Sequence, residues 1–359
     1  MSKRIVISGY YGFGNTGDEA VLAGMLAAFR QLGLDLAITV LSADPDRTIA
    51  EHPGVLSVHR YGIPAVIKAM RRADLVISGG GSLLQDATSA RSAQYYLFIL
   101  RLAQFLRRPT IVYAQGIGPL ERPGIRRSAA RILNKTKLIT VRDKDSRTLL
   151  ESMGVSVPPI HVTCDPSFLI EPDIEAAGDL LDRHGLQGRD LIGISLRSWM
   201  SNSWLAAAVD GISAACEELG ITPVVIPMQE SEDREVSMKI SKGVMLECGG
   251  NARIIKGIIA QCGLLVGMRL HSLIFATDVG VACVPIAYDP KISAFAASIG
   301  REPAMDVTTP DSGKLKNAVI QAWTDRETLS AGAGEHARRL RAKAVESGEM
   351  VAEFLRNIS

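Results

Sequence analysis

Short apolar runs rich in β-branched residues alternate along this chain with stretches in which apolar side chains recur at helical spacing. This alternation is typical of βαβ units and predicts parallel sheets covered by helices. In the N-terminal part, a helix is expected at Asp18–Gln31. Strands are expected there at Arg4–Ser8, Ala37–Leu41, Asp74–Ser78, Thr110–Ala114, Leu138–Val141 and His161–Cys164.

A looser polar stretch at 166–189 interrupts this pattern and predicts a domain boundary, on the evidence of Pro172, Gly185 and Gly188. A second alternating series follows it. Strands are expected at Leu191–Leu196, Pro223–Ile226, Val244–Leu246, Leu264–Val266 and Ala282–Ile286, and helices at Ser203–Glu218, Glu232–Ser241, Ala252–Gln261 and Leu270–Asp278. The tail, Ser312–Ile358, is expected to be helical and charged.

The length of 359 residues is well beyond that of a typical single domain, so two domains are expected. The pattern predicts an α/β protein with two doubly wound lobes facing a cleft, at 1–170 and 186–310, and C-terminal helices at 311–359. In such folds ligands bind beyond the carboxyl ends of the strands. Function is therefore sought in the loops that follow strands.

Composition and charge exclude several classes of function. Lys and Arg total 40 and Asp and Glu 38, so the net charge of +2 provides no broad positive field for nucleic acid. The five cysteines are scattered without any C-x-x-C pair, which predicts reduced core thiols and neither a disulfide framework nor a zinc site. The first apolar run is too short for a signal peptide, and no apolar stretch is long enough to span a membrane. We expect a cytoplasmic protein.

The loop after the first strand carries Gly12-x-Gly14-x-x-Gly17, which matches the dinucleotide fingerprint. The match starts several residues after the strand, however, and the acidic residue wanted at the tip of the second strand is in doubt. The pattern alone therefore leaves a tight turn and a ligand loop equally open. Further Gly-rich loops follow strands at Ser78–Asp86 and Gln115–Pro119. Asn15, Asp18 and Glu19 favour a ligand rich in hydroxyl groups.

Cationic residues follow several of the expected strands, as a site for a carboxylate or phosphate requires. The residues are Arg142, Arg197, Arg269, His271 and Lys291. An ion pair with Asp143 is the alternative for Arg142 taken singly. For His271 the alternative is a buried core histidine, but its place two residues after an arginine at a strand end favours proton transfer.

Two other features have no clear chemical role. The remaining histidines, His52, His59, His161, His184 and His336, show no metal-like grouping with one another, and no metal is expected. The apolar segment Tyr95–Arg108 carries three arginines, so contact with a membrane surface is one interpretation. A helix packed on the sheet is the interpretation that we favour.

Six motifs, taken in order, resemble the polysaccharide pyruvyltransferases of the CsaB type. They are GYYGFGNTGDEAVL at Gly9–Leu22, DLVISGGGSLLQD at Asp74–Asp86, YAQGIGP at Tyr113–Pro119, VRDKDS at Val141–Ser146, GMRLHSLIFA at Gly267–Ala276 and YDPKI at Tyr288–Ile292. The resemblance implies a pair of Rossmann-like lobes of the glycosyltransferase-B kind. It covers both lobes but not the C-terminal tail.

The resemblance further implies transfer of the enolpyruvyl group of phosphoenolpyruvate onto a sugar, with a cyclic pyruvate ketal as the product. The implied acceptor is a lipid-linked cell-wall polysaccharide precursor ending in an N-acetylmannosamine-type sugar, and the product serves to anchor surface-layer proteins. No cofactor beyond the donor substrate and no metal is implied. Peripheral contact with the cytoplasmic face of the membrane is compatible with such an acceptor.

Site residues follow from the matching motifs. Arg142, His271 and Lys291 are expected to be essential, with His271 as the proton shuttle. Phosphoenolpyruvate is expected to contact Arg142, Lys291, Arg197 and Arg269, the last two on position alone. Acceptor-binding groups are expected in the N-terminal lobe at Asn15, Asp18, Glu19, Gly80, Gly81, Ser82 and Asp86.

Three rival functions remain open at this point. A nucleotide-sugar-dependent glycosyltransferase would use the same cations to hold a diphosphate. A non-catalytic sugar-phosphate binding protein would be expected to lack the Arg269 and His271 pair, and both residues are present. A nicotinamide-dependent oxidoreductase is the most distant alternative.

Overall fold

The computed structural model describes residues 2–86, 90–240 and 242–358. The chain forms two compact units. Unit 1 consists of residues 1–170 together with 340–359, and unit 2 consists of residues 171–339. The tail expected as one helical segment at 311–359 is therefore divided between the units.

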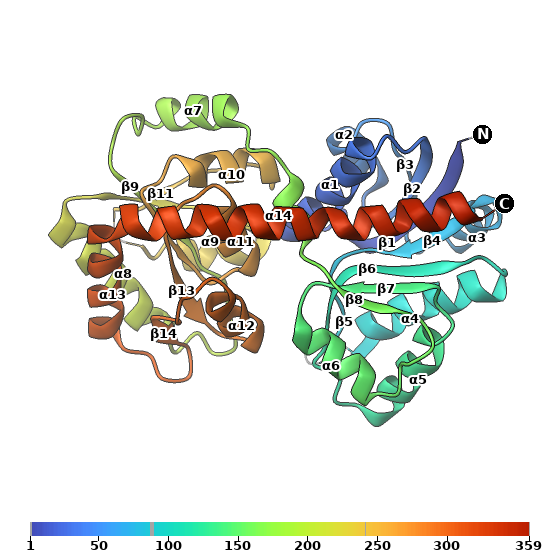
Figure 1. The fold of residues 1–359 in the computed structure, drawn as a ribbon. Helices are drawn as coiled ribbons and strands as arrows, with labels where there is room; N and C mark the ends of the chain where they lie inside the picture. Colours follow the sequence, from blue (N-terminus) through green and yellow to red (C-terminus); the bar gives the residue numbers. More distant parts are fainter. Residues whose placement is uncertain (1, 87–89, 241, 359) are drawn as a thin grey trace. The chain divides into compact units, whose positions relative to one another are not determined.

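Unit 1 contains a parallel sheet with the strand order β3-β2-β1-β4-β6-β7-β8, and β5 pairs with β6 (Figure 1). Its strands are β1 (Lys3–Tyr11), β2 (Leu36–Ser42), β3 (Leu56–His59), β4 (Leu75–Ser78), β5 (Gly81–Leu84), β6 (Thr110–Ile117), β7 (Leu138–Val141) and β8 (Ile160–Val162). Its helices are α1 (Thr16–Gln31), α2 (Pro45–Glu51), α3 (Ile63–Arg72), α4 (Ala90–Phe105), α5 (Pro123–Leu133), α6 (Lys144–Ser152) and a 3₁₀ turn at Pro166–Leu169.

Side-chain alternation along β1 explains how the helices cover this sheet. Ile5 and Ile7 pack in the core under α1, whereas Val6 packs on the opposite face with α3 and α4. Because successive strand residues point to opposite faces, an uninterrupted apolar run such as 5–7 of β1 requires cover on both faces of the sheet. The segment Tyr95–Arg108 is thus mainly part of a helix that packs on the sheet, as favoured above.

Unit 2 contains a parallel sheet with the order β11-β10-β9-β12-β13-β14. Its strands are β9 (Leu191–Ser195), β10 (Thr222–Val225), β11 (Val244–Met245), β12 (Leu264–Gly267), β13 (Cys283–Ala287) and β14 (Met305–Asp306). Its helices are α7 (Ile174–Arg183), α8 (Leu205–Leu219), α9 (Glu230–Ser237), α10 (Ala252–Ala260), α11 (Leu270–Asp278), α12 (Pro290–Ser298) and α13 (Ser312–Thr324). The end of the helix expected at Glu232–Ser241 lies outside the described residues.

The last helix, α14 (Arg326–Asn357), begins in unit 2 and ends in unit 1. In unit 1 its Val351 and Leu355 are part of the hydrophobic core beside α1. The Ser347 hydroxyl lies within hydrogen-bond distance of Thr163 and Thr140, at 2.8 and 3.1 Å. These apolar and hydroxyl contacts are the reason why the end of the tail belongs to the first unit.

The stretch at 166–189, expected as a domain boundary, contains the division between the two units, at residues 170 and 171, and also α7. Its buried Ala177, Leu180 and Leu181 recur at helical spacing, and the Asp173 carboxylate caps its start by accepting the Ala176 amide. The interruption in the strand pattern is real, but it contains a helix of unit 2.

The expected fold class is confirmed. The protein is α/β, with two doubly wound parallel sheets of the Rossmann-like kind and helices at the C-terminus. Among the helices of the described residues, none has the length and hydropathy that crossing a bilayer requires.

Candidate functional site

The carboxyl ends of β9 and β12 lie side by side in unit 2, at the point where the strand order reverses. From this switch point the chain runs outward through β10 on one side and β13 on the other. Doubly wound sheets bind ligands at this position, because the loops diverge there and leave space. Four of the cationic or histidine side chains predicted from the sequence follow these strands, namely Arg197, Arg269, His271 and Lys291.

Arg197 follows β9, and its guanidinium lies against a pair of contacting aromatic rings. Nη1 donates to the Tyr288 hydroxyl at 3.2 Å. The guanidinium carbon is 5.2 Å from the ring centre of Trp199 and 5.1 Å from that of Tyr288, which are cation–π distances. The side chain keeps 20% of its surface exposed. Arg197 is therefore held in place yet accessible to an anion.

Arg269 follows β12 and is buried in a hydrogen-bonded ion pair. Its Nε donates to Oδ2 of Asp233 at 3.1 Å, and its Nη2 donates to Oδ1 of the same carboxylate. Nη2 also lies 3.2 Å from Oε2 of Glu232. Burial lowers the pKa of Arg269, but the Asp233 charge and hydrogen bond outweigh burial and raise it above its ordinary value. Arg269 stays charged and is engaged by carboxylates of its own chain.

Glu232 and Asp233 belong to the site, although they were not predicted as site residues. They lie in α9, which follows β10, and Asp233 is fully buried. Two backbone amides, those of Met228 and Gln229, donate to Oδ2 of Asp233. The sequence signal that could have found them is the run of acidic residues shortly after the apolar strand β10. In the sheet, β10 pairs with β9, the strand that leads to Arg197.

Lys291 and His271 complete this edge of the unit 2 sheet. Lys291 is in the first turn of α12, where Nζ lies 3.4 Å from the Asp289 carboxylate and 5.6 Å from the ring centre of Tyr288. His271 is the second residue of α11, directly after the turn that carries Arg269, and is partly exposed. Arg197, Arg269 and Lys291 thus each lie near a carboxylate, so their positive charges are partly offset within the site, which the sequence did not predict.

The Gly-rich loops of unit 1 gather at the corresponding edge of its sheet, where β1 and β4 are neighbours. Asn15 caps α1 by accepting the Gly17 amide at 3.0 Å. Oε1 of Glu19 accepts the Gly12 amide at 2.8 Å. A side chain on Gly81 would collide with Oδ1 of Asp18, so the two loops touch here. Asn15 and Glu19 therefore order the first loop by their own hydrogen bonds.

Arg142 lies in unit 1, after β7, and its side chain is largely buried. Nη1 donates to Oδ2 of Asp165 at 3.0 Å, and Nη2 donates to the Ser82 hydroxyl at 2.8 Å. The ion pair of Arg142 with Asp143 is present at 3.8 Å, although Asp143 also caps α6, and the closer carboxylate is that of Asp165. Gly116 is required next to it, since a Cβ there would overlap the guanidinium.

Asp86 and Gly80 have local structural roles. Both carboxylate oxygens of Asp86 accept backbone amides, those of Glu121 at 2.8 Å and Arg122 at 2.9 Å, just before α5. A Cβ on Gly80 would overlap the Val21 side chain, so glycine lets the loop pack on α1. Acceptor contacts of these residues stay a prediction.

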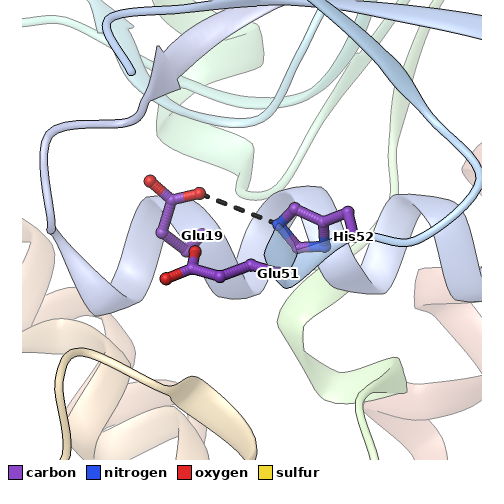
Figure 2. Close-up of side chains that lie close together, drawn as sticks. All are labelled: Glu19, Glu51 and His52. Carbon is purple, nitrogen blue, oxygen red and sulfur yellow. Dashed lines mark ion pairs between the residues drawn. The ribbon is translucent and has the colours of Figure 1, made fainter. Parts of the chain in front are cut away.

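Three side chains in unit 1 lie where a metal ion could be held. Glu19, Glu51 and His52 each offer one ligand atom, and these atoms lie within 4.8 Å of one another (Figure 2). The five histidines gave no such signal with one another, because the group combines one histidine with two glutamates of separate helices.

Comparison with known proteins identifies the family. The family model of the polysaccharide pyruvyl transferases matches residues 15–290. The chain belongs to this family. The match includes Arg142, Arg197, Arg269 and His271 and ends one residue before Lys291. Membership confirms the resemblance stated above and the coarse assignment to transferases of polysaccharide biosynthesis.

Relatives and solved structures are similar over nearly the whole chain. A curated family relative, the amylovoran biosynthesis protein AmsJ of Erwinia amylovora, is 21% identical over 99% of this chain and 100% of its own length. Anabaena HepE in complex with UDP and glucose has a TM-score of 0.66 at 15% identity, covering 99% of both chains. MnaA of S. aureus with UDP has a TM-score of 0.65 at 12% identity, covering 99% of this chain and 96% of that one. At these identities the structural likeness shows the glycosyltransferase-B-like fold alone.

Proposed function

We propose that this protein transfers the enolpyruvyl group of phosphoenolpyruvate to a sugar and forms a cyclic pyruvate ketal with release of phosphate. The observation that carries the proposal is the grouping of Arg197, His271 and Lys291 after neighbouring strands of the unit 2 sheet. Phosphoenolpyruvate presents a carboxylate and a phosphate, and two accessible cations on one edge match this pair of anionic groups.

The proposed donor contacts are assigned by the exposure of each cation, because all three already form an ion pair within the chain. Arg197 and Lys291 keep exposed surface and are assigned to the carboxylate and phosphate of the donor. Arg269 is held by Asp233 and Glu232, so its proposed part is to position the turn that carries His271 and to add positive potential. A fixed charge of this kind lowers the barrier because it need not reorient during the reaction.

The proposed reaction starts with proton transfer from protonated His271 to the methylene carbon of phosphoenolpyruvate. The adjacent carbon becomes electrophilic, a sugar hydroxyl adds to it, and the proton of that hydroxyl restores protonated His271. Phosphate then leaves with the electron pair of its C–O bond. A second hydroxyl of the same sugar adds to the same carbon, and its proton leaves with the phosphate. Donor and sugar diol are thereby converted into ketal and phosphate with all protons accounted for.

The acceptor is proposed to bind unit 1, as an N-acetylmannosamine-type sugar of a lipid-linked cell-wall precursor whose ketal anchors surface-layer proteins. The Gly-rich loops supply Asn15, Asp18, Glu19, Gly80, Gly81, Ser82 and Asp86. Tyr10 and Phe13 stack at 4.1 Å between ring centres beside the first loop, and aromatic faces suit the apolar faces of sugar rings. Arg142 is proposed to be required because it fixes Ser82 of the second loop.

A lipid-linked acceptor is supported by an exposed surface of unit 1 formed by α3, α4 and the residues just after α4, which we call the α3–α4 face. Exposed apolar side chains there include Ile63, Phe98 and Phe105. Exposed cations there are Lys68, Arg71, Arg72, Arg91, Arg101 and Arg107. Neither helix contains Asp or Glu. Aromatic side chains with surrounding cations fit the interface of a membrane that carries anionic lipids, so we propose peripheral binding at the cytoplasmic face.

The test is incubation of the purified protein with phosphoenolpyruvate and a panel of acceptors that end in N-acetylhexosamines. The expected result is release of inorganic phosphate together with a product heavier by pyruvate less water. A matched series replaces phosphoenolpyruvate with nucleotide sugars. Release of a nucleoside diphosphate in that series, with no ketal from any acceptor, would overturn the proposal in favour of a glycosyltransferase. Binding of sugar phosphates without turnover would overturn it in favour of a non-catalytic protein.

A further inference from the structure

The group formed by Glu19, Glu51 and His52 lies in unit 1 between two helices (Figure 2). Glu19 is in the first turn of α1, whereas Glu51 is the last residue of α2 and His52 caps that helix. Glu19 and His52 are only 4% and 9% exposed. Glu51 is on the solvent side of the group.

Two buried atoms of this group have no hydrogen-bond partner among the described residues. They are Oε2 of Glu19 and Nε2 of His52. The atoms lie 3.8 Å apart, beyond the length of a hydrogen bond. Buried carboxylate oxygens and imidazole nitrogens in native proteins are nearly always engaged, so two such atoms facing each other indicate a missing partner between them.

The rest of the group is already held in place. The other oxygen of Glu19 accepts the Gly12 amide at 2.8 Å, which fixes the orientation of the carboxylate. Oε1 of Glu51 accepts Nε of Arg47 at 2.7 Å. Metal ligands are commonly oriented in this way by hydrogen bonds from neighbouring groups. The two glutamates carry two negative charges, so one divalent cation is enough to neutralise them. Arg47, paired with Glu51 at the solvent side, then adds one positive charge beside the group.

The donor atoms and their spacing indicate the kind of ion. Bonds of about 2.1 Å from a transition metal to nitrogen and oxygen join ligand atoms that are up to about 4.2 Å apart. The Glu19–His52 distance of 3.8 Å falls within this limit. An imidazole nitrogen with two carboxylates favours zinc or manganese, since calcium and magnesium prefer oxygen ligands alone.

We propose that Glu19, Glu51 and His52 bind one divalent transition-metal ion. The ion would join the start of α1 to the end of α2 and, through Glu19, would order the backbone of the first Gly-rich loop at Gly12. This inference concerns metal binding and holds whether or not the proposed reaction is correct.

The test is isothermal titration of chelator-treated, tag-free full-length protein with zinc chloride and, separately, with manganese chloride. The expected result is one ion bound per chain, with affinity reduced at least about tenfold in Glu51→Gln, because each ligand contributes directly to the ion's binding energy. Glu51 is on the solvent side, so this variant is expected to fold. His52→Gln is expected to abolish binding, and His59→Gln, a control in the adjacent strand β3, is expected to bind as the unaltered protein does.

Two results would overturn the inference. One is unaltered protein that binds neither ion, which would leave Glu19 and His52 as an ion pair formed when the imidazole is protonated. The other is unchanged affinity in both Glu51→Gln and His52→Gln, which would place any bound ion elsewhere. Cobalt absorption spectra of the unaltered protein and of Glu51→Gln give a readout that is independent of enzyme activity.

Discussion

The guanidinium of Arg269 is bound by the carboxylate of Asp233 through two hydrogen bonds at the switch point of the unit 2 sheet. The carboxylate also accepts two backbone amides before α9. One buried acidic group therefore fixes both the loop after β10 and the turn after β12. We therefore expect the Arg269–Asp233 pair to stabilise the site and not to contact the substrate directly.

Replacement of this carboxylate tests that role. Asp233→Asn leaves the buried guanidinium of Arg269 with only the more exposed Glu232 carboxylate as a counter-charge. Removal of one partner of a buried ion pair costs up to roughly 3–5 kcal/mol. The free energy of unfolding of Asp233→Asn, measured in urea, is expected to fall by this amount. Asp210→Asn, at an exposed position of α8, is the control and is expected to change little. Equal stability of the two variants would show that Arg269 does not depend on Asp233.

His271→Ala tests the proton shuttle. Loss of a general acid reduces the rate of the chemical step about 100- to 10,000-fold. The variant is expected to retain its melting temperature and its affinity for phosphoenolpyruvate, because His271 is partly exposed and the donor is assigned to the cations. His184→Ala, at an exposed position after α7, serves as the control. Ketal formation by His271→Ala at a near-normal rate would remove this assignment.

The buried thiols predict a decline in stability at alkaline pH. Burial raises the pKa of Cys262 to about 12 and that of Cys283 to about 11. Thiols of the unfolded chain ionise near pH 8.5 or so. Because the folded pKa values are the higher ones, the protonated thiols contribute stability that is fully present below the unfolded pKa and is lost as the pH rises through the folded values.

This prediction is measured as the free energy of unfolding in urea between about pH 8 and pH 11. A Cys262→Ala, Cys283→Ala double variant is expected to lose less stability over this range than the unaltered protein. Parallel curves for the two proteins would contradict the prediction. In the native state at the lower end of the range, both thiols are expected to resist alkylation.

The α3–α4 face predicts binding to anionic vesicles. Phe105 is 82% exposed, and burying one aromatic side chain contributes about 1.5–3 kcal/mol, so Phe105→Ser is expected to weaken vesicle binding by about tenfold or more. Val157→Ser removes an equally exposed apolar side chain from the loop before β8 and is the control. Co-sedimentation with vesicles of neutral and anionic lipids provides the measurement. Equal binding by the two variants, or no preference for anionic lipid, would rule out this face.

Most of the strand framework could be predicted, because strands buried on both faces are short uninterrupted apolar runs. Leu138–Val141 and the helix Leu270–Asp278 have the expected bounds. The edge strand Leu56–His59 was missed because its residues are partly exposed and carry no apolar run. Its neighbours α2 and α3 were missed for a related reason, since each buries only one or two side chains.

For the candidate site, the sequence could predict which residues lie at the same edge of the sheet, but not which side chains they bind. Parallel strands end at a common edge, so the positions after β9, β12 and β13 could be inferred to lie together from sequence spacing alone. The partners of the cations could not. Asp165 and Asp233 are far along the chain from the arginines they bind, and nothing in local spacing pairs them. The same holds for His52, which meets Glu19 through the packing of two helices.

Helix α14 has a consequence for the order of synthesis. Unit 1 receives Val351 and Leu355 of its core from the part of α14 that is made after all of unit 2. Domains usually fold as their residues leave the ribosome, with the N-terminal one first. Here the N-terminal sheet keeps part of one apolar face open until Val351 and Leu355 of α14 have been made. The nascent chain therefore depends on this part of α14, or on a chaperone until it has been made, to avoid aggregation.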